Sequence, residues 1–292
     1  MNNETAMVKS IKNITAFFVL VFIFSLPFYI LASLVPGEMA MFIGLTLALA
    51  PFSAALILVF WENRSFGTKR LLKRSFDYKR VTIKSWYFPI FFLFPILFLL
   101  ALGLMIFMGA PLPDPIAPVL AAPVAFLAFF LFALFEELGW MGYAFDPMQE
   151  RWHALIASLI LGVIWAAWHI PLYVFAGLDP LWIAGQLISL IGIRTLIVWI
   201  YNNTGKSVFA AILFHAVYNV CTIMITSFYT SLGHLFTSIF IIITAVIVVF
   251  LWGPETLAQY RLSKVEQYHW YAKSESPIGL HGLCWSCGLY CN

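Results

Sequence analysis

Long apolar segments follow one another along most of the chain, with short polar connections between them. A helix needs about 20 apolar residues to cross ~30 Å of hydrocarbon. Windows of that length can be drawn over residues 13–35, 39–61, 86–109, 117–145, 155–176, 181–201, 207–229 and 233–253. Helices are predicted because lipid cannot satisfy open backbone groups and because the alternation of a barrel strand is missing. The predicted fold class is therefore all-α, a polytopic membrane helix bundle with eight transmembrane helices.

Composition excludes a soluble globular domain. Hydrophobic residues make up 63% of the chain and charged residues only 10%, whereas soluble domains average about 45–50% and about 25%. The first apolar segment is followed directly by another and lacks a clear cleavage site, so we interpret it as a membrane helix rather than a signal peptide. We expect one membrane domain over residues 1–255 and a poorly ordered cytoplasmic tail over residues 256–292.

Positive charge is distributed unevenly between the two sets of connections. With the amino terminus inside, fifteen of the sixteen Lys and Arg lie on the inner side, eight of them between Arg64 and Lys84. The positive-inside rule then predicts a multi-pass protein of the cell membrane with both termini cytoplasmic. The basic segment favours contact with membrane lipids over a partner site. No domain-wide basic face exists, so nucleic acid is not expected as a partner.

Few polar side chains that ionise or form strong hydrogen bonds fall inside the predicted spans. They are Glu136, Glu137, His169, Arg194, His215 and Asn219. Such groups are costly in lipid and usually face a bundle interior or a wet cavity. His215 and Asn219 lie four residues apart and share a helical face, whereas adjacent Glu136 and Glu137 lie about 100° apart around the helix. One glutamate is therefore expected to face the site while the other pairs or packs.

These residues suit the activation of water. A carboxylate can take a proton from water, imidazoles can orient that water or hold a metal, and an amide can stabilise an oxyanion. Each residue also has a structural interpretation: a single His or Asn often joins helices by hydrogen bonds, and a single Arg often reaches the interface or balances a buried Glu. Taken together on four predicted helices, the set favours a functional site over packing.

Three short motifs resemble a known family. The strings FEELGWMGYAF (135–145), WAAWH (165–169) and HAVYN (215–219) are similar to the three motifs of the CPBP family of intramembrane peptidases, also called the Abi or type II CAAX prenyl endopeptidase family. The resemblance covers about residues 115–225 and includes the order of the motifs and their placement on the predicted spans.

The resemblance implies hydrolysis of a peptide bond in a peptide or protein substrate, as in CAAX processing of lipidated proteins or cleavage of a bacteriocin or leader peptide. It implies that Glu136 activates water, that His169 and His215 orient it, that Asn219 donates to the oxyanion and that Glu137 is a supporting carboxylate. The cofactor stays open: either Glu136, His169 and His215 bind a divalent metal such as zinc, or a glutamate mechanism works without one.

One position departs from the family pattern. The first motif usually reads EExxxR, and this chain has Met141 where Arg is expected. We hypothesise that Arg194, at a similar depth, pairs with Glu137 instead. The alternative is a catalytically silent member, a membrane scaffold or a bacteriocin self-immunity protein. A transporter with a proton relay is a third interpretation, disfavoured because no inverted repeat is visible.

The tail contains Cys284, Cys287 and Cys291. With His281 these thiols could form a metal knuckle, or they could be acylated near the membrane. A tail without fixed structure is the simpler interpretation.

Overall fold

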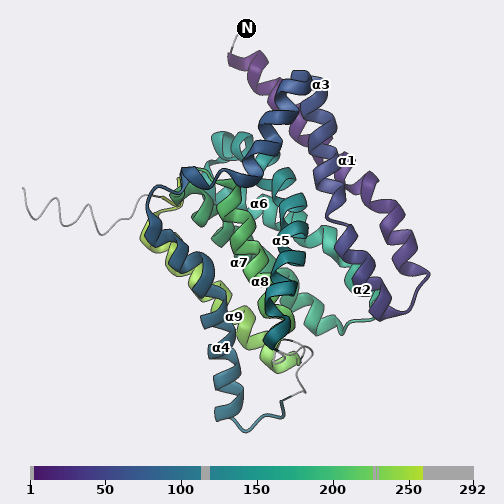
Figure 1. Ribbon diagram of the computed structural model, residues 1–292, viewed down its shortest axis with the longest axis vertical. Coiled ribbons are helices and arrows are strands. Elements are labelled where there is room, and N and C mark those ends of the chain that lie inside the picture. Colours follow the sequence, from purple (N-terminus) through teal and green to yellow (C-terminus); the bar gives the residue numbers. More distant parts are fainter. Residues whose placement is uncertain (1–2, 113–118, 226–227, 229, 259–292) are drawn as a thin grey trace, which may run out of the picture.

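The computed structural model describes residues 3–112, 119–225, 228 and 230–258, all in helices, turns and connections without a strand in these ranges (Figure 1). The elements are the α-helices α1 (Asn3–Ser33), α2 (Gly37–Thr46), α3 (Leu49–Lys73), α4 (Tyr87–Phe107), α5 (Ala122–Gly139), α6 (Asp146–Phe175), α7 (Pro180–Asn203), α8 (Val208–Met224) and α9 (Ser231–Trp252). Short 3-10 turns lie at Arg74–Phe76, Tyr78–Arg80, Lys84–Trp86 and Val119–Ala121, and a π-helix spans Trp140–Phe145. The all-α polytopic bundle is thereby confirmed.

Three of the predicted spans differ from the observed helices. The second window, 39–61, is divided into α2 and α3 by a break at Leu47 and Ala48, and α3, interrupted at Arg64, extends through the basic segment to Lys73. Windows 117–145 and 155–176 fall in one helical stretch, Ala122–Phe175, which is interrupted at His153 by a left-handed backbone conformation with φ of 54°. By length and apolar composition six described stretches qualify as spans, and the shorter apolar helix Val208–Met224 adds a seventh candidate. The number eight therefore stays a prediction.

The interruption at His153 is stabilised by the carboxyl-terminal end of the described chain. A helix begins with backbone N–H groups that lack helical partners. Behind the interruption, Ala154 N and Leu155 N donate to the carbonyl oxygens of Glu255 and Pro254 at 2.8 and 2.9 Å. Leu257 is fully buried, so the described chain ends packed against the bundle. The predicted cysteine cluster lies outside the described residues.

Helix α7 occupies the centre of the bundle. It packs against α6, α8 and α9, while α5 packs against α3 and α8, and Figure 1 shows α7 and α8 between α4 and α9 on one side and α1 to α3 on the other. Two thirds (67%) of the most apolar window of α7 is buried, against 28% for α1 and α9. Residues of α7 are therefore shielded from lipid, whereas the outer helices present exposed apolar side chains.

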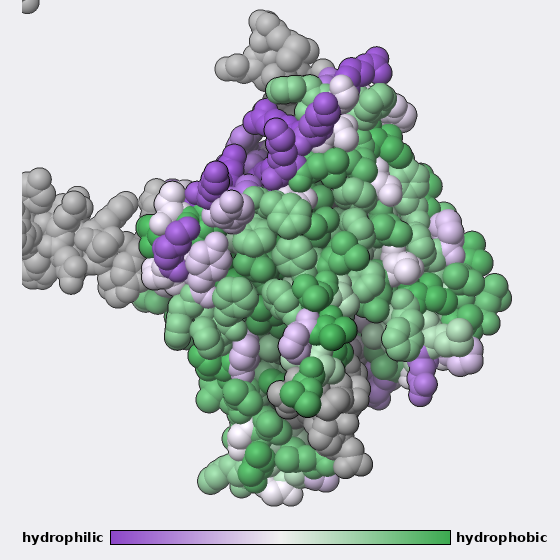
Figure 2. Space-filling view, in the orientation of Figure 1, coloured by the Kyte–Doolittle hydropathy of each residue, from purple (hydrophilic) through white to green (hydrophobic). Residues whose placement is uncertain are grey.

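A polar band crosses one end of the visible face (Figure 2). Figure 2 shows hydrophilic residues gathered near the end of α3 and hydrophobic residues over most of the remaining visible face. The exposed cations Arg64, Lys69, Arg70, Lys73 and Lys79 lie in this region. A broad apolar face bordered by one charged band is the surface expected of a chain that spans a membrane.

Candidate active site

The last turn of α5 carries both glutamates into the interior. Glu136 is 8% exposed and Glu137 is 0% exposed, and the helix continues directly into the π-helix Trp140–Phe145. Gly139 brings this turn close to α3, because a Cβ atom there would lie 2.6 Å from the carbonyl oxygen of Pro51. Single π turns inside helices are frequent at functional sites. Here the π-helix follows the two glutamates without a break.

Glu137 is held by two partners from different helices. Arg194 Nη1 of α7 donates to both carboxylate oxygens, at 3.1 and 2.8 Å, and Nδ1 of His215 in α8 lies 2.8 Å from Oε1. Arg194 is the partner that the sequence predicted, and Met141 is fully buried nearby in the π-helix. A single guanidinium nitrogen therefore bridges both carboxylate oxygens, and such charge-assisted hydrogen bonds are stronger than neutral ones. Glu137 therefore fixes the orientation of His215.

Glu136 points in another direction, as the spacing of adjacent helical residues predicted. Its Oε2 accepts hydrogen bonds from two buried indole N–H groups, at 3.3 Å from Trp140 Nε1 and 2.8 Å from Trp165 Nε1. The ring of Trp165 also contacts the guanidinium of Arg194, whose Cζ lies 4.2 Å from the ring centroid. Trp165 thus binds Glu136 directly and contacts the guanidinium that pairs with Glu137.

His169 has a defined tautomer. Its Nδ1 lies 2.8 Å from the carbonyl oxygen of Trp165. Because a carbonyl oxygen only accepts hydrogen bonds, Nδ1 must carry the proton. When the ring is neutral, Nε2 is therefore left with a lone pair, available to water or another donor. The ring is held between Trp168, at 4.8 Å, and Tyr173, which stacks on it at 5.5 Å between centroids.

A cavity of about 510 Å³ joins these groups. Glu136, His169, His215 and Asn219 line it, whereas Glu137 and Arg194 do not. The rest of the lining is largely apolar and comes from α2, α5, α6, α7, α8 and Phe228. Glu137 therefore lies behind the cavity wall and contacts it through His215.

The sequence of this chain matches a known protein family and a protein of that kind. The family model for type II CAAX prenyl endopeptidase Rce1-like proteins matches residues 118–221. The CAAX prenyl protease 2 of Methanococcus maripaludis is 32% identical over 187 residues, which cover 59% of this chain and 68% of that protein.

This chain belongs to the type II CAAX prenyl endopeptidase family. The matched residues run from the region before α5 to Cys221 in α8 and contain all the polar groups described above. Membership in the family supports a protease embedded in the membrane. The substrate and the way in which a bond would be cut are taken up under the proposed function.

The metal site considered for this family member does not match the observed placement. In the described part of the chain, no group of three or more His, Cys, Asp or Glu side chains is gathered closely enough to hold a metal ion. Of the candidate ligands Glu136, His169 and His215, the first also has one carboxylate oxygen bound to two indoles. No step proposed below involves a metal.

Several residues of this family member's site were missed by the sequence interpretation. Trp140 and Trp165 bind Glu136, and Tyr173, Gln186 and Tyr218 line the same cavity. Four of them, Trp140, Trp165, Tyr173 and Tyr218, lie one helical turn from Glu136, His169 or His215, so spacing was the signal that could have found them. In a chain with 11 Trp and 12 Tyr, an aromatic residue does not otherwise indicate a site.

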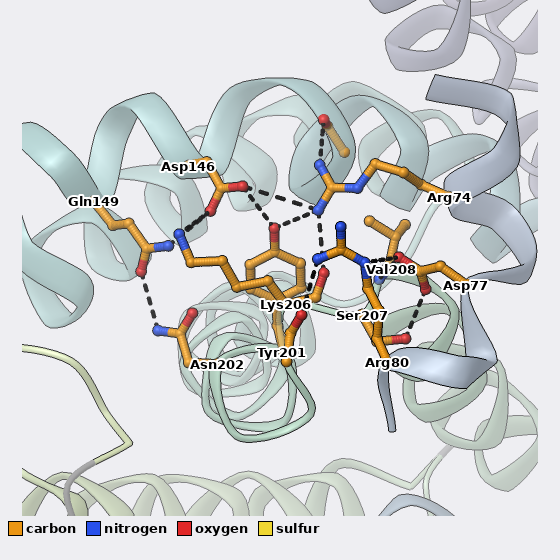
Figure 3. Close-up of polar contacts among 12 residues, drawn as sticks. Arg74, Asp77, Arg80, Asp146, Gln149, Tyr201, Asn202, Lys206, Ser207 and Val208 are labelled. Atoms are coloured by element: carbon orange, nitrogen blue, oxygen red, sulfur yellow. Dashed lines mark hydrogen bonds and ion pairs between the residues drawn. The ribbon is translucent and has the colours of Figure 1, made fainter. Parts of the chain in front are cut away.

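A helix-end network of polar side chains holds the helices that carry the site (Figure 3). Asp146, at the start of α6, accepts from Tyr201 at 2.9 Å, pairs with Lys206 Nζ at 3.0 Å and lies 3.9 Å from Arg74. Arg74 also donates to the carbonyl oxygen of Gly142 in the π-helix at 2.8 Å. The basic segment after α3 is thereby joined to α6 and α7.

The same network caps the beginning of α8. Asp77 accepts from Ser207 Oγ at 2.7 Å (Figure 3). Asp77 also accepts from Phe209 N at 3.1 Å, and Ser207 Oγ accepts from Ala210 N at 3.2 Å. A side-chain acceptor at this position typically contributes about 1 kcal/mol to helix stability. The cap fixes where α8 begins, and so the depth at which His215 and Asn219 lie.

Proposed function

We propose that this protein is an intramembrane endopeptidase that hydrolyses a peptide bond of a substrate held in the cavity. The observation that carries the proposal is that Glu136, His169, His215 and Asn219, from three helices, line one cavity. General acid–base catalysis needs its groups within reach of a common reacting atom. An apolar lining with a few convergent polar groups is the usual form of such a site.

In the proposed reaction Glu136 accepts a proton from a water molecule, and the oxygen of that water bonds to the carbonyl carbon. Nε2 of His169, unprotonated in the neutral tautomer, accepts a hydrogen bond from the same water and orients it. The Asn219 amide donates to the oxyanion of the tetrahedral intermediate. Glu136 then passes its proton to the leaving nitrogen as the C–N bond breaks, which yields a new carboxyl end and a new amine.

His215 is proposed as the second group that orients water or the oxyanion. Its Nδ1 is directed at Glu137, which places Nε2 on the opposite edge of the ring. Glu137 and Arg194 are positioning residues here, because they line no part of the cavity and act through His215. The replacement of the motif arginine by Met141 favoured a silent scaffold or immunity protein. Arg194 provides Glu137 with the cation that Met141 lacks, which supports the peptidase instead.

For the substrate we propose the carboxyl-terminal region of a membrane-associated peptide or protein, of the CAAX kind that the name of the archaeal relative gives. A lipidated peptide and an unmodified leader peptide are the two forms to be compared. We further propose that both termini and the polar band lie on the cytoplasmic side, because the cations gather there. Membrane lipids then cover the apolar surface.

The test is a cleavage assay on the protein purified in detergent, with a peptide library that contains farnesylated and unmodified members. Glu136→Gln keeps the size of the side chain and its acceptor oxygen for the indoles but removes the base. We expect a loss of about 10²–10⁴-fold in rate, the usual contribution of a general base. Glu150→Gln, an exposed glutamate in α6, is the matched control and should cleave like the wild type. Equal rates for Glu136→Gln and wild type would refute the proposal, and metal content is measured on the same samples.

A further inference from the structure

The cavity contains a second polar group that the proposed reaction does not use. Gln186 of α7 donates from Nε2 to the hydroxyl of Tyr218 in α8 at 3.1 Å and to the hydroxyl of Tyr173 in α6 at 3.4 Å. The Tyr218 hydroxyl also lies 3.4 Å from Oε1 of Gln186. All three residues line the cavity and are at least 94% buried. We call Tyr173, Gln186 and Tyr218 the amide cluster.

The amide cluster lies one helical turn beyond the proposed catalytic groups. Tyr173 follows His169 by four residues, and Tyr218 follows His215 by three. At a rise of 1.5 Å per residue these offsets correspond to about 6 and about 4.5 Å along the helices. An extended peptide advances ~3.3 Å per residue. A substrate whose scissile bond lies at His169 and His215 would therefore place a main-chain group at the amide cluster one or two residues away.

The chemistry of the cluster matches a neutral peptide group. Its donors and acceptors are an amide and two hydroxyls, and no Lys or Arg lines the cavity. An ionised carboxylate would be buried there without a counter-ion, which is costly. A peptide group offers one N–H and one C=O, which suit the oxygen and nitrogen of the Gln186 side chain. Two of the three internal contacts, at 3.4 Å, are longer than usual hydrogen bonds, so a ligand can provide better partners.

Aromatic rings bound the cavity beyond the cluster. Trp182 packs edge-on against Tyr173 and against Phe228, with centroids 5.6 Å apart in both pairs. Both Trp182 and Phe228 also line the cavity. The amide cluster is thus a polar position between the proposed catalytic groups and an aromatic wall. A substrate would present a main-chain amide to the cluster and an apolar side chain to the wall.

We propose that Tyr173, Gln186 and Tyr218 form a subsite that binds a main-chain amide of the substrate one or two residues from the scissile bond. Gln186 makes the decisive contact, since it touches both tyrosines. This deepens the proposed function and rests on it. The subsite sets the register of the peptide by its backbone, and so it selects for an extended chain with apolar side chains rather than for one particular residue.

The test measures binding in a Glu136→Gln background, so that it does not depend on cleavage. The probe is a peptide ending in farnesyl-cysteine, two aliphatic residues and serine, together with two analogues in which an ester replaces one of the last two amides. We expect one analogue to bind five- to tenfold more weakly by titration calorimetry in detergent, the loss of about one hydrogen bond. Adding Gln186→Leu should weaken the all-amide peptide by a similar factor and abolish the difference between amide and ester.

Ser189→Ala, in the same helix, is the matched control. Ser189 is buried and bonds Ser238 of α9 at 2.7 Å, outside the cavity lining, so this variant should keep the amide–ester difference. The subsite would be overturned by any of three results: equal affinity for all three peptides, strictly additive effects of the ester and of Gln186→Leu on affinity, or no binding of any probe. Amide-dependent binding combined with wild-type cleavage that does not need Glu136 would instead refute the proposed function and leave the subsite standing.

Discussion

Two arginine–carboxylate pairs attach to the same helical stretch, Ala122–Phe175, and their surroundings differ. Glu137 and Arg194 have no exposed side-chain surface, whereas the Arg74 and Asp146 side chains are 18% and 29% exposed. In the inner pair Nη1 of Arg194 donates to both carboxylate oxygens, at 2.8 and 3.1 Å. The outer pair is 3.9 Å apart, with Tyr201 and Lys206 sharing the carboxylate. Water can replace a lost partner at Asp146 but not at Glu137.

The two pairs therefore have different roles: the inner pair orients His215, and the outer pair holds helix ends together. A buried charge must keep its partner, so the geometry of the inner pair is fixed and can hold His215 in one orientation. The helix-end network has several partly exposed members that substitute for one another, and it holds helix ends in place without setting any single angle. The largest effects are therefore expected at the inner pair and the smallest at the exposed lysine of the outer one.

Removal of the inner cation should have the largest effect on stability. Arg194→Leu leaves Glu137 buried without its main partner, and such a change typically costs about 3–5 kcal/mol of the free energy of unfolding. Thermal unfolding of the detergent-purified protein measures it. Arg151→Leu, which removes an exposed cation of α6, is the control and should change stability by less than about 0.5 kcal/mol. Similar losses of unfolding free energy in the two variants would mean that the buried pair contributes no more than an exposed cation.

Restoring the arginine of the family motif should recover part of that loss. Met141→Arg alone is expected to destabilise, because it forces a larger, charged side chain into a fully buried position. In the Arg194→Leu background it provides a new partner for Glu137. The double variant should then be more stable than the sum of the single effects by about 1–3 kcal/mol. Additive effects would show that position 141 cannot reach the carboxylate.

Loss of the outer carboxylate should have a moderate effect. Asp146→Asn keeps the size of the side chain and some hydrogen bonding but removes the charge shared by Arg74 and Lys206. Because partly exposed pairs contribute roughly 0.2–1 kcal/mol each, we expect a loss of about 1 kcal/mol in thermal unfolding. Cleavage by this variant should stay within a few-fold of wild type. A loss as large as that of Arg194→Leu would contradict the distinction between the two pairs.

Salt should produce the smallest effect. Between ~0.1 M and ~1 M the screening length falls from ~10 Å to ~3 Å. The stability difference between wild type and Asp146→Asn should shrink by a few tenths of a kcal/mol, since Lys206 is 45% exposed. The difference for Arg194→Leu should not change. Equal salt sensitivity of the two differences would indicate that water reaches the inner pair.

Hydropathy predicted the helical bundle well and the helix ends poorly. A run of charge ends an apolar window, but Lys and Arg are good helix formers, and so helical structure resumes after an interruption at Arg64, where φ is 54°, and extends to Lys73. The division between α2 and α3 lies four residues before Pro51, which has no N–H to donate to the carbonyl oxygen of Leu47, so the proline marks a break that hydropathy alone does not show. The interruption at His153 depends on carbonyl groups of residues 254 and 255, which no local pattern contains.

The site was predictable where it is charged and unpredictable where it is aromatic. Ionisable residues are rare in the spans, and helical spacing separates Glu136 from Glu137, so the pairing of Glu137 with Arg194 could be inferred and is confirmed. The indole donors of Trp140 and Trp165 and the amide cluster were not inferred. Most of these residues lie one helical turn from a polar site residue, but that spacing is common in a helical chain rich in aromatic residues, and their polar atoms become relevant only once packing brings them together.

The most direct measurement is a paired comparison of cleavage and thermal unfolding for Glu136→Gln and Glu137→Gln, purified side by side. Glu136 lines the cavity and Glu137 does not. Glu136→Gln should therefore abolish cleavage while its unfolding temperature stays close to wild type, and Glu137→Gln should lower the unfolding temperature because Arg194 loses its partner. Cleavage that persists in Glu136→Gln, with stability unchanged in Glu137→Gln, would contradict the division of roles between the two carboxylates.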